Sequence, residues 1–332
     1  MTICLRRREF ILGVGSAAVG PIVARAQRTV PLIVWLSASA ANAADAVNEV
    51  LAPFRQGLKE GGYEEGRNIE IQYRYAEYQH DRLPSLAADL VRLRVAVIVA
   101  AGGAPALAAK AATATIPIVF VTGVDPVAMS FVPRQNRPGG NLTGASYLSN
   151  AYYAKGIELM HELAPEASAF SFLMNPTNPV NRAVMLREME NSARTLGLRL
   201  TTLNASSPAE IDQAFSTLAQ ERTGGLILDS DAFIVGQGDQ IVALATRFRV
   251  PVMYPYREMV RAGGLMSYGG RRAEAYRIGG GYTARILNGE NPGDLPVQFA
   301  TRIGLSLNLK TAKALGLAVP TSILLRADEV IE

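Results

Sequence analysis

Cysteine, histidine and tryptophan are scarce in this chain of 332 residues. It holds one cysteine, Cys4, one tryptophan, Trp35, and two histidines, His80 and His161. A single cysteine excludes a disulfide within the chain and a cysteine-based metal site. Each histidine lacks a second ligand at metal-binding spacing, and both lie in stretches typical of solvent-facing turns or helices. We therefore expect no metal and no cofactor, and a fold that rests on an ordinary apolar core.

Sequence motifs of catalysis are missing as well. The first apolar run leads into LSASAANAAD, which is not the G-x-G-x-x-G of a dinucleotide-binding fold. Neither a G-x-S-x-G nucleophile elbow nor a G-x-x-x-x-G-K-S/T phosphate loop occurs. Three carboxylates that could form an acid pair, Asp125, Asp229 and Asp231, have no histidine or cysteine beside them. We expect no catalytic residues and a protein that is not an enzyme.

The first 26 residues have the layout of a cleavable export signal. Arginines at positions 6, 7 and 8 precede a mildly apolar run over 10–23, and small residues at 24–26 predict cleavage after Ala26. The run is too short, and too interrupted by glycine and proline, to span a membrane. Its weak hydrophobicity favours the twin-arginine route over an ordinary secretory signal. Both routes predict a protein of the periplasm.

The charge balance argues against nucleic acid as a partner. The first 26 residues carry four arginines and one glutamate, so the net charge of +4 falls to +1 without them. A nucleic-acid surface needs a concentrated basic patch, and no DNA- or RNA-binding motif occurs. The chain that remains after the first 26 residues is longer than a single hydrophobic core usually supports. Its length therefore predicts two domains or lobes.

Strand-like apolar runs alternate with helical patterns along the chain, which predicts an α/β protein. The runs are apolar throughout and rich in β-branched residues, as in parallel sheets whose two faces are both covered by helices. Helical spacing of apolar residues follows them over 47–58, 83–90 and 211–218. The expected strands lie at 32–36, 69–75, 95–101 and 116–122, and then at 170–174, 198–203, 225–228 and 251–254.

A repeated order of elements predicts two similar, doubly wound lobes of the type I periplasmic-binding kind, with a ligand cleft between them. Residues 54–103 and 189–231 both read helix, glycine stop, strand, helix, strand. Turn-rich stretches near 140–148, 254–268 and 298–306 are the candidate crossings. We therefore expect an N-terminal lobe of residues 28–145 plus 267–298, and a C-terminal lobe of 146–266 plus 299–332. The run at 279–281, Gly-Gly-Gly, lies inside a helical pattern and predicts close helix packing.

Ligands in open parallel sheets bind beyond the carboxyl ends of the strands, where loops lead into helices. Small and polar residues follow the expected strands, together with a few aromatic ones, which suits a small polar or zwitterionic molecule. The candidate binding residues are Ser37, Gly103, Ala104, Thr122 and Asp125 of the first lobe and Asn175, Asp229, Asp231, Tyr254 and Tyr268 of the second.

Several segments in sequence order resemble the substrate-binding proteins of ABC transporters of the tryptophan/tyrosine-binding type. The resemblance covers essentially the whole chain after the signal. The segments are FRQGLKEGGYEEGRNIEIQYRYAEY, IPIVFVTGVDPVAMSFV, RPGGNLTGASYL, ILDSDAFI, RAGGLMSYGG, ARILNGENPGDLPVQFAT and LSLNLKTAKALGLAVPTSILLRADEVI.

The resemblance implies a two-lobed receptor that closes over a small solute and delivers it to the membrane permease of an ABC importer. An aromatic amino acid is the expected solute, and we expect a monomer. Several members carry a lipid anchor, whereas this chain has no cysteine placed for one. Two alternatives stay open: a ligand-sensing protein that docks on a membrane receptor, and a periplasmic hydrolase or lyase.

Both ends of an amino acid have candidate partners in this sequence. Asp231, with Asp125 as second choice, is expected to receive the ammonium group. Backbone N–H groups at Gly103 and Ala104, and the hydroxyls of Ser37 and Thr122, are expected to receive the carboxylate. A flat side chain would stack on aromatic residues. Each role has a structural alternative. Asp125 before Pro126 has the pattern of a helix cap with proline at the first helical position, and Trp35, inside a strand, often belongs to the core in such a position.

Overall fold

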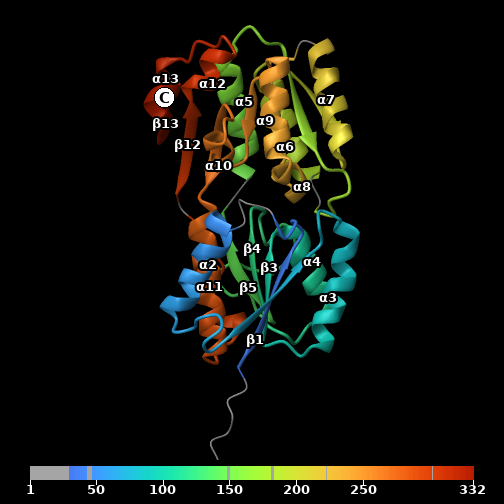
Figure 1. Cartoon of the computed structure of the whole chain (residues 1–332), viewed down its shortest axis with the longest axis vertical. Coiled ribbons are helices and arrows are strands. Elements are labelled where there is room, and N and C mark those ends of the chain that lie inside the picture. The colour runs from blue at the N-terminus through green and yellow to red at the C-terminus, as the bar shows by residue number, and fades with distance from the viewer. Residues whose placement is uncertain (1–29, 43–46, 148–149, 181–182, 222, 301) are drawn as a thin grey trace, which may run out of the picture. The chain divides into compact units, whose positions relative to one another are not determined.

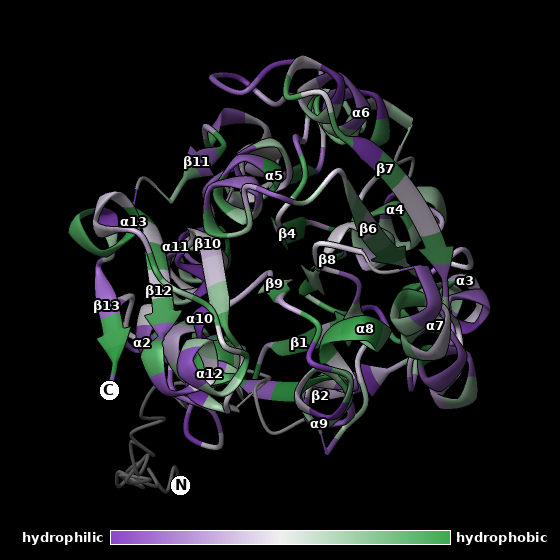
Figure 2. Ribbon diagram, turned by 90° about the horizontal axis from the view of Figure 1, so that it is seen from above, coloured by the Kyte–Doolittle hydropathy of each residue, from purple (hydrophilic) through white to green (hydrophobic). Residues whose placement is uncertain are grey.

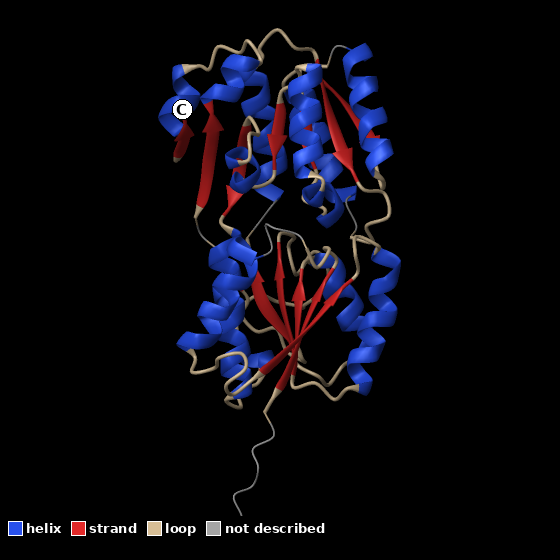
Figure 3. Cartoon of the chain, viewed as in Figure 1, coloured by secondary structure: helices blue, strands red, loops and turns tan. Residues whose placement is uncertain are grey.

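The structure, a computed structural model, describes residues 30–332 except 43–46, 148–149, 181–182, 222 and 301. The export signal predicted for residues 1–26 lies outside the described residues. The described chain forms two separate β-sheets, and helices cover both faces of each (Figures 1 and 3). This confirms the predicted α/β class with two parallel-sheet lobes. The lobe built on each sheet is called the first or the second lobe below.

The first sheet contains six strands, and each strand pairs in parallel with its neighbours. Parallel strands buried on both faces must be apolar along their whole length, which is why continuous apolar runs predicted them. In the order of the sheet, the strands are β11 (Gln298–Phe299), β5 (Leu142–Ser146), β4 (Ile118–Thr122), β3 (Val97–Ala101), β1 (Leu32–Ser37) and β2 (Glu70–Tyr75).

Alternate side chains of these strands enter two different cores. Ile33 and Trp35 pack on one face of the sheet with residues of two helices, while Val34 and Leu36 pack on the opposite face with residues of two others. The first pair of helices is α2 (Ala52–Glu60) and α11 (Arg272–Leu287), and the second pair is α3 (Leu83–Arg92) and α4 (Gly103–Ala112). Shorter turns are η1 (Val47–Leu51), η2 (His80–Arg82) and η3 (Pro292–Asp294).

The second sheet contains seven strands, and only the pair of β10 with β12 is antiparallel among the pairs described. β7, at one edge, has no buried residue and shows mixed hydropathy, whereas β6 beside it is hydrophobic (Figure 2). In order, the strands are β13 (Glu329–Ile331), β12 (Ile303–Asn308), β10 (Met266–Gly270), β9 (Val252–Tyr254), β8 (Leu226–Leu228), β6 (Ala169–Met174) and β7 (Arg199–Asn204).

Helices also cover both faces of the second sheet. α5 (Asn150–Leu163), α6 (Ala183–Thr195), α12 (Leu309–Ala314) and α13 (Thr321–Arg326) contribute to one core. The other core holds residues of α7 (Pro208–Glu221), α8 (Ala232–Gly236), α9 (Gly238–Phe248) and α10 (Arg257–Arg261). The apolar residues of α7 at the predicted helical spacing are all buried: Ile211, Ala214, Phe215 and Leu218.

Glycines let α2 and α11 pack with their backbones in contact. A Cβ added to Gly57 would lie 2.0 Å from the carbonyl oxygen of Arg277, and one added to Gly280 would lie 2.0 Å from that of Phe54. The close helix packing predicted from the glycine run is therefore confirmed. It brings the start of α11 onto the first sheet, although the chain reaches α11 directly from β10 of the second sheet.

The chain passes between the sheets after β5, after β10 and after β11. These passages place residues distant in sequence at the same strand ends. No helix in the described part of the chain combines the length and the apolar character that crossing a membrane requires.

Candidate functional site

A cavity of about 420 Å³ lies where the strands of both lobes end. Its wall includes residues that follow β1, β3 and β4 of the first sheet and β8 and β9 of the second. The size is within the usual range for small-molecule sites, about 300–1,000 Å³. Its position agrees with the rule that parallel sheets bind ligands beyond the carboxyl ends of their strands.

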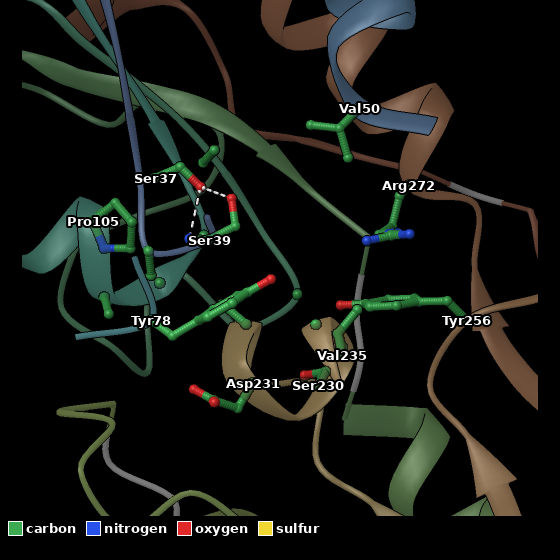
Figure 4. A pocket seen from close by; sticks show the side chains of 18 of the residues that line it. Ser37, Ser39, Val50, Tyr78, Pro105, Ser230, Asp231, Val235, Tyr256 and Arg272 are labelled. Carbon is green, nitrogen blue, oxygen red and sulfur yellow. Dashed lines mark hydrogen bonds between the residues drawn. The ribbon is translucent and has the colours of Figure 1, made fainter. Parts of the chain in front are cut away.

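One end of the cavity is lined by hydroxyl groups and the start of a helix. Ser37 ends β1, and its Oγ lies 2.8 Å from the Oγ of Ser39 and accepts the backbone N–H of Ser39 at 3.2 Å (Figure 4). Thr122 ends β4 nearby. Gly102 has a φ of 113°, a value that glycine adopts far more readily than other residues. This conformation allows β3 to turn directly into α4. The first N–H groups of α4 are therefore presented beside these hydroxyls, an arrangement suited to an anion.

Another part of the cavity wall is aromatic. Trp35 of β1 and Tyr276 of α11 both line it, with ring centroids 5.7 Å apart. Tyr147 and Tyr256 complete this wall, and their hydroxyl oxygens are 3.3 Å apart. Burial raises the pKa of the Tyr147 and Tyr276 hydroxyls above the ordinary value, so both stay neutral hydrogen-bonding groups.

A buried cation lies against this aromatic wall. The side chain of Arg272 is 9% exposed, its guanidinium carbon lies 3.7 Å from the centroid of the Tyr256 ring, and its Nη2 donates to Glu258 at 3.3 Å. Burial works against the charge of Arg272, but the attraction of Glu258 and of nearby tyrosine oxygens raises its pKa overall. Burial likewise opposes ionisation of Glu258, yet Arg272 lowers the pKa of that carboxyl overall. The pair is therefore ionised, with no net charge.

Asp231 is the centre of a buried hydrogen-bond network in the floor of the cavity. Its Oδ1 accepts from Asn175 Nδ2 at 3.0 Å and from the backbone N–H of Phe233 at 2.9 Å, where it caps α8. Its Oδ2 accepts from Asn178 Nδ2 at 2.6 Å and contacts His80 Nε2 at 2.9 Å. The side chain is fully buried. Three donors and the His80 ring therefore surround this carboxylate, which lines the cavity and links several elements of its wall.

His80 joins the two lobes, and its predicted exposure is wrong. It begins η2 in the first lobe and is 6% exposed, because its ring reaches Asp231 of the second lobe, 151 positions further along the chain. Tyr78 adds to this contact. Its φ of 64° is uncommon for a residue other than glycine, and its ring lies 6.2 Å from that of Phe233. A second contact between the lobes is that of Arg257 Nη2, which lies 3.3 Å from Glu49 Oε2 of the first lobe.

The structure places half of the predicted binding residues in the cavity wall. Ser37, Gly103, Ala104, Thr122 and Asp231 line it, and their contact with a ligand stays a prediction. The other five are absent from the lining. Of these, Asn175 donates to Asp231, and Asp229 accepts from the Tyr153 hydroxyl at 2.9 Å. Tyr254 and Tyr268 pack in or against the two cores of the second lobe.

Asp125, the fifth of these residues, caps a turn. Its Oδ1 accepts the N–H groups of Val127 at 2.8 Å and Ala128 at 3.2 Å. The helix expected after Asp125 is not formed, because residues 126–130 make only a turn and Ser130 adopts a left-handed φ of 56°. The carboxylate keeps the capping role that the sequence predicted as one of two possibilities.

Several lining residues were missed from the sequence. Tyr78, Tyr256 and Arg272 lie in loops or at a helix start, and no periodic pattern marks them. Trp35 was expected either to stack on the ligand or, more often for a strand residue, to belong to the core; it belongs to the core and also lines the cavity. Among the described residues, no group of three or more histidine, cysteine, aspartate or glutamate side chains is arranged to hold a metal ion.

This is the architecture of a two-lobed solute receptor, and comparison with known proteins gives its family. The sequence model described as ABC transporter substrate binding protein matches residues 39–331. The chain belongs to that family, and it is the substrate-binding protein of an ABC transporter. A tyrosine-binding protein from Clostridioides difficile (strain R20291) is 28% identical over 263 residues, which cover 79% of this chain and 75% of the relative.

Two solved structures are similar over 91% of this chain and 99% of their own. A conserved domain protein from Vibrio cholerae O1 biovar El Tor has a TM-score of 0.81 at 28% identity. An ABC domain from Streptococcus pneumonia in complex with L-Trp has a TM-score of 0.79 at 23% identity. Both share the fold of the described chain.

Proposed function

We propose that the cavity binds an L-amino acid with an aromatic side chain, which the protein delivers to the permease of an ABC importer. The observation that carries this proposal is the mixed lining of the cavity, which combines hydroxyls and a helix start with Trp35 and several tyrosines. Ser37 and Ser39 lie on one side of the cavity and Tyr256 on the other (Figure 4). A zwitterion with a flat side chain has the same division into a polar and an aromatic part. The relative described as a tyrosine-binding protein and the similar structure in complex with L-Trp support the same class of ligand.

The ligand carboxylate is placed at the polar end. The hydroxyls of Ser37 and Thr122 and the first N–H groups of α4, at Gly103 and Ala104, are the donors in this proposal. Charge-assisted hydrogen bonds of this kind are about twice as strong as neutral ones. Closure over the ligand would remove these donors and the carboxylate from water together, which strengthens their interaction.

The ligand ammonium group is placed toward Asp231. The oxygens of Asp231 are engaged by side chains and by the start of α8, so we propose that its charge, acting at short range, attracts the ammonium group. The aromatic side chain then extends between Trp35, Tyr256 and Tyr276, where ring contacts contribute about 0.5–1.5 kcal/mol each beyond burial.

The finer assignments of location and organisation belong to the same proposal. The protein is exported to the periplasm by the twin-arginine route, cleaved after Ala26, and acts there as a monomer without catalysis. The lobe bounds expected from the sequence were residues 28–145 plus 267–298 and residues 146–266 plus 299–332. Because β10 (Met266–Gly270) pairs within the second sheet, we place the second passage after Gly270 and not at residue 267.

Calorimetric titration tests the ligand class. The protein recovered from the periplasm is unfolded and refolded to remove any copurified ligand, and is then titrated with L-tyrosine, L-tryptophan, L-phenylalanine, L-alanine and glucose. We expect binding of at least one aromatic amino acid, and affinity for L-alanine lower by about a hundredfold or more, because alanine buries no ring. Tryptophan fluorescence gives a second signal, since Trp35 is the only tryptophan and lines the cavity.

Binding of glucose or L-alanine with none of the three aromatic amino acids would show that the assignment of the ligand is wrong. Binding without any change in Trp35 fluorescence would place the ligand elsewhere than in this cavity. Mass spectrometry of the extract released on unfolding provides an independent identification of the natural ligand.

A further inference from the structure

Ser230 lies between two buried aspartates at the end of β8 and is itself partly exposed. Asp229 is 1% exposed and Asp231 is 2% exposed, whereas Ser230 belongs to the cavity wall beside Asp231 (Figure 4). A serine hydroxyl can donate one hydrogen bond and can also accept hydrogen bonds through two lone pairs. The group that Ser230 offers to a ligand therefore depends on where its own proton is held.

The proton of the neighbouring Tyr153 hydroxyl is held by Asp229. Tyr153, on α5, donates to Oδ1 of Asp229 at 2.9 Å, and its oxygen lies 3.1 Å from Oγ of Ser230. An ionised carboxylate can only accept, and hydrogen bonds to a charged oxygen are about twice as strong as neutral ones. Because a tyrosine hydroxyl has a single proton, the proton that Tyr153 gives to Asp229 is not available to Ser230.

The Tyr153 oxygen is therefore the acceptor in both of its contacts with Ser230. It accepts the backbone N–H of Ser230 at 3.2 Å, and in the contact at 3.1 Å it takes the hydroxyl proton of Ser230. These two bonds use the two lone pairs of the tyrosine oxygen. With its proton held in this way, Oγ of Ser230 has only lone pairs left for a molecule in the cavity.

The ammonium end of an amino acid matches an oxygen that only accepts. An ammonium group has three N–H donors and no acceptor, whereas a carboxylate has acceptors alone and would meet the lone pairs of Ser230 unfavourably. The negative charge of the adjacent Asp231 favours the same end of the ligand. The position of Ser230 and its fixed proton therefore agree on one ligand group.

We propose that Oγ of Ser230 accepts a hydrogen bond from the ammonium group of the ligand while Tyr153 holds the serine proton. This inference rests on the proposed function, in which an aromatic amino acid occupies the cavity with its carboxylate at the Ser37 end. It gives the ammonium group a direct partner next to the charge of Asp231. Asp229, which the sequence predicted as a ligand contact, then orients Tyr153 without touching the ligand.

The test uses the aromatic amino acid that binds most tightly in the titration above, together with two analogues. Its desamino acid lacks the ammonium group, and its primary amide keeps the ammonium group but carries no carboxylate. Each affinity is measured by competition against the amino acid. In Ser230→Ala we expect the amino acid and the amide both to bind about tenfold more weakly, because each loses a charged hydrogen bond, while the desamino acid changes by less than about threefold.

Ser37→Ala is the matched control, because it removes a serine hydroxyl that the proposed function assigns to the ligand carboxylate. We expect it to weaken the amino acid and the desamino acid and to affect the amide less. Ser230→Thr keeps the hydroxyl group and is expected to bind the amino acid within about threefold of the wild-type affinity, which separates the loss of the hydroxyl from a folding defect.

Three results would overturn the proposal: Ser230→Ala leaves the affinity for the amino acid unchanged, weakens all three ligands alike, or weakens the desamino acid while sparing the amide. The last of these would place the ligand carboxylate at Ser230. If the wild-type protein binds no aromatic amino acid, the proposed function fails first, and this inference falls with it.

Discussion

Replacing Asp231 by alanine is expected to lower the free energy of unfolding by about 3–5 kcal/mol. The carboxylate is fully buried and receives hydrogen bonds from Asn175, Asn178 and the N–H of Phe233, and it also contacts His80. Alanine cannot accept any of them, so several buried donors lose their partner at once. Urea denaturation followed by circular dichroism measures the change.

Asp239→Ala is the matched control for this prediction. Asp239 also lines the cavity and also carries one negative charge, but it is exposed. Its loss changes the net charge by the same amount, and we expect the free energy of unfolding to change by less than about 0.5 kcal/mol. Equal effects of the two substitutions would mean that charge alone matters and that the network around Asp231 contributes little.

The same network has a consequence for ligand binding. His80 belongs to the first lobe and Asp231 to the second, so their contact exists only while the lobes are together. A receptor of this kind binds its solute by shifting an equilibrium between open and closed states. The buried contact stabilises the closed state whether or not a ligand is bound. The ligand therefore needs to supply less of the free energy of closure.

Continuous apolar runs explain why the strands of the sheets could be predicted from the sequence. The apolar run over 116–122 contains β4, and that over 32–36 contains nearly all of β1, because both strands are buried on both faces. The turn at Asp125 shows where such local signals fail. Asp125 followed by proline is a strong helix start, but the left-handed Ser130 ends the segment after a single turn.

The site was predictable only where it follows from strand ends. Ser37 and Thr122 were predicted because each ends a buried strand, and both line the cavity. His80 and Arg272 were missed for the opposite reason. Their partners Asp231 and Tyr256 come from the other lobe, and no pattern within a short segment records a contact between distant segments. Burial of a charged or polar side chain is decided by tertiary packing, which one sequence does not display.

The glycines between α2 and α11 give the second large expected effect. In Gly280→Ala the new methyl carbon would lie 2.0 Å from the Phe54 carbonyl oxygen and 2.8 Å from the Leu58 nitrogen, both rigid backbone atoms. The helices must separate, and the core that contains Phe54, Leu58 and Trp35 must open with them. We expect the free energy of unfolding to fall by about 4 kcal/mol or more, measured by urea denaturation.

Gly281→Ala, one position further along the same helix, separates packing from helix propensity. No atom lies within 4 Å of a Cβ added there, so alanine meets no obstacle and is expected to stabilise the protein by about 0.5–1 kcal/mol. Opposite signs at adjacent glycines would show that the contact with α2, and not flexibility of the glycine run, requires Gly280. A similar stabilisation by both substitutions would contradict the close crossing of α2 and α11. Because α11 also carries Arg272 and Tyr276 into the cavity, we expect Gly280→Ala to weaken ligand binding as well, whereas Gly281→Ala should leave it unchanged.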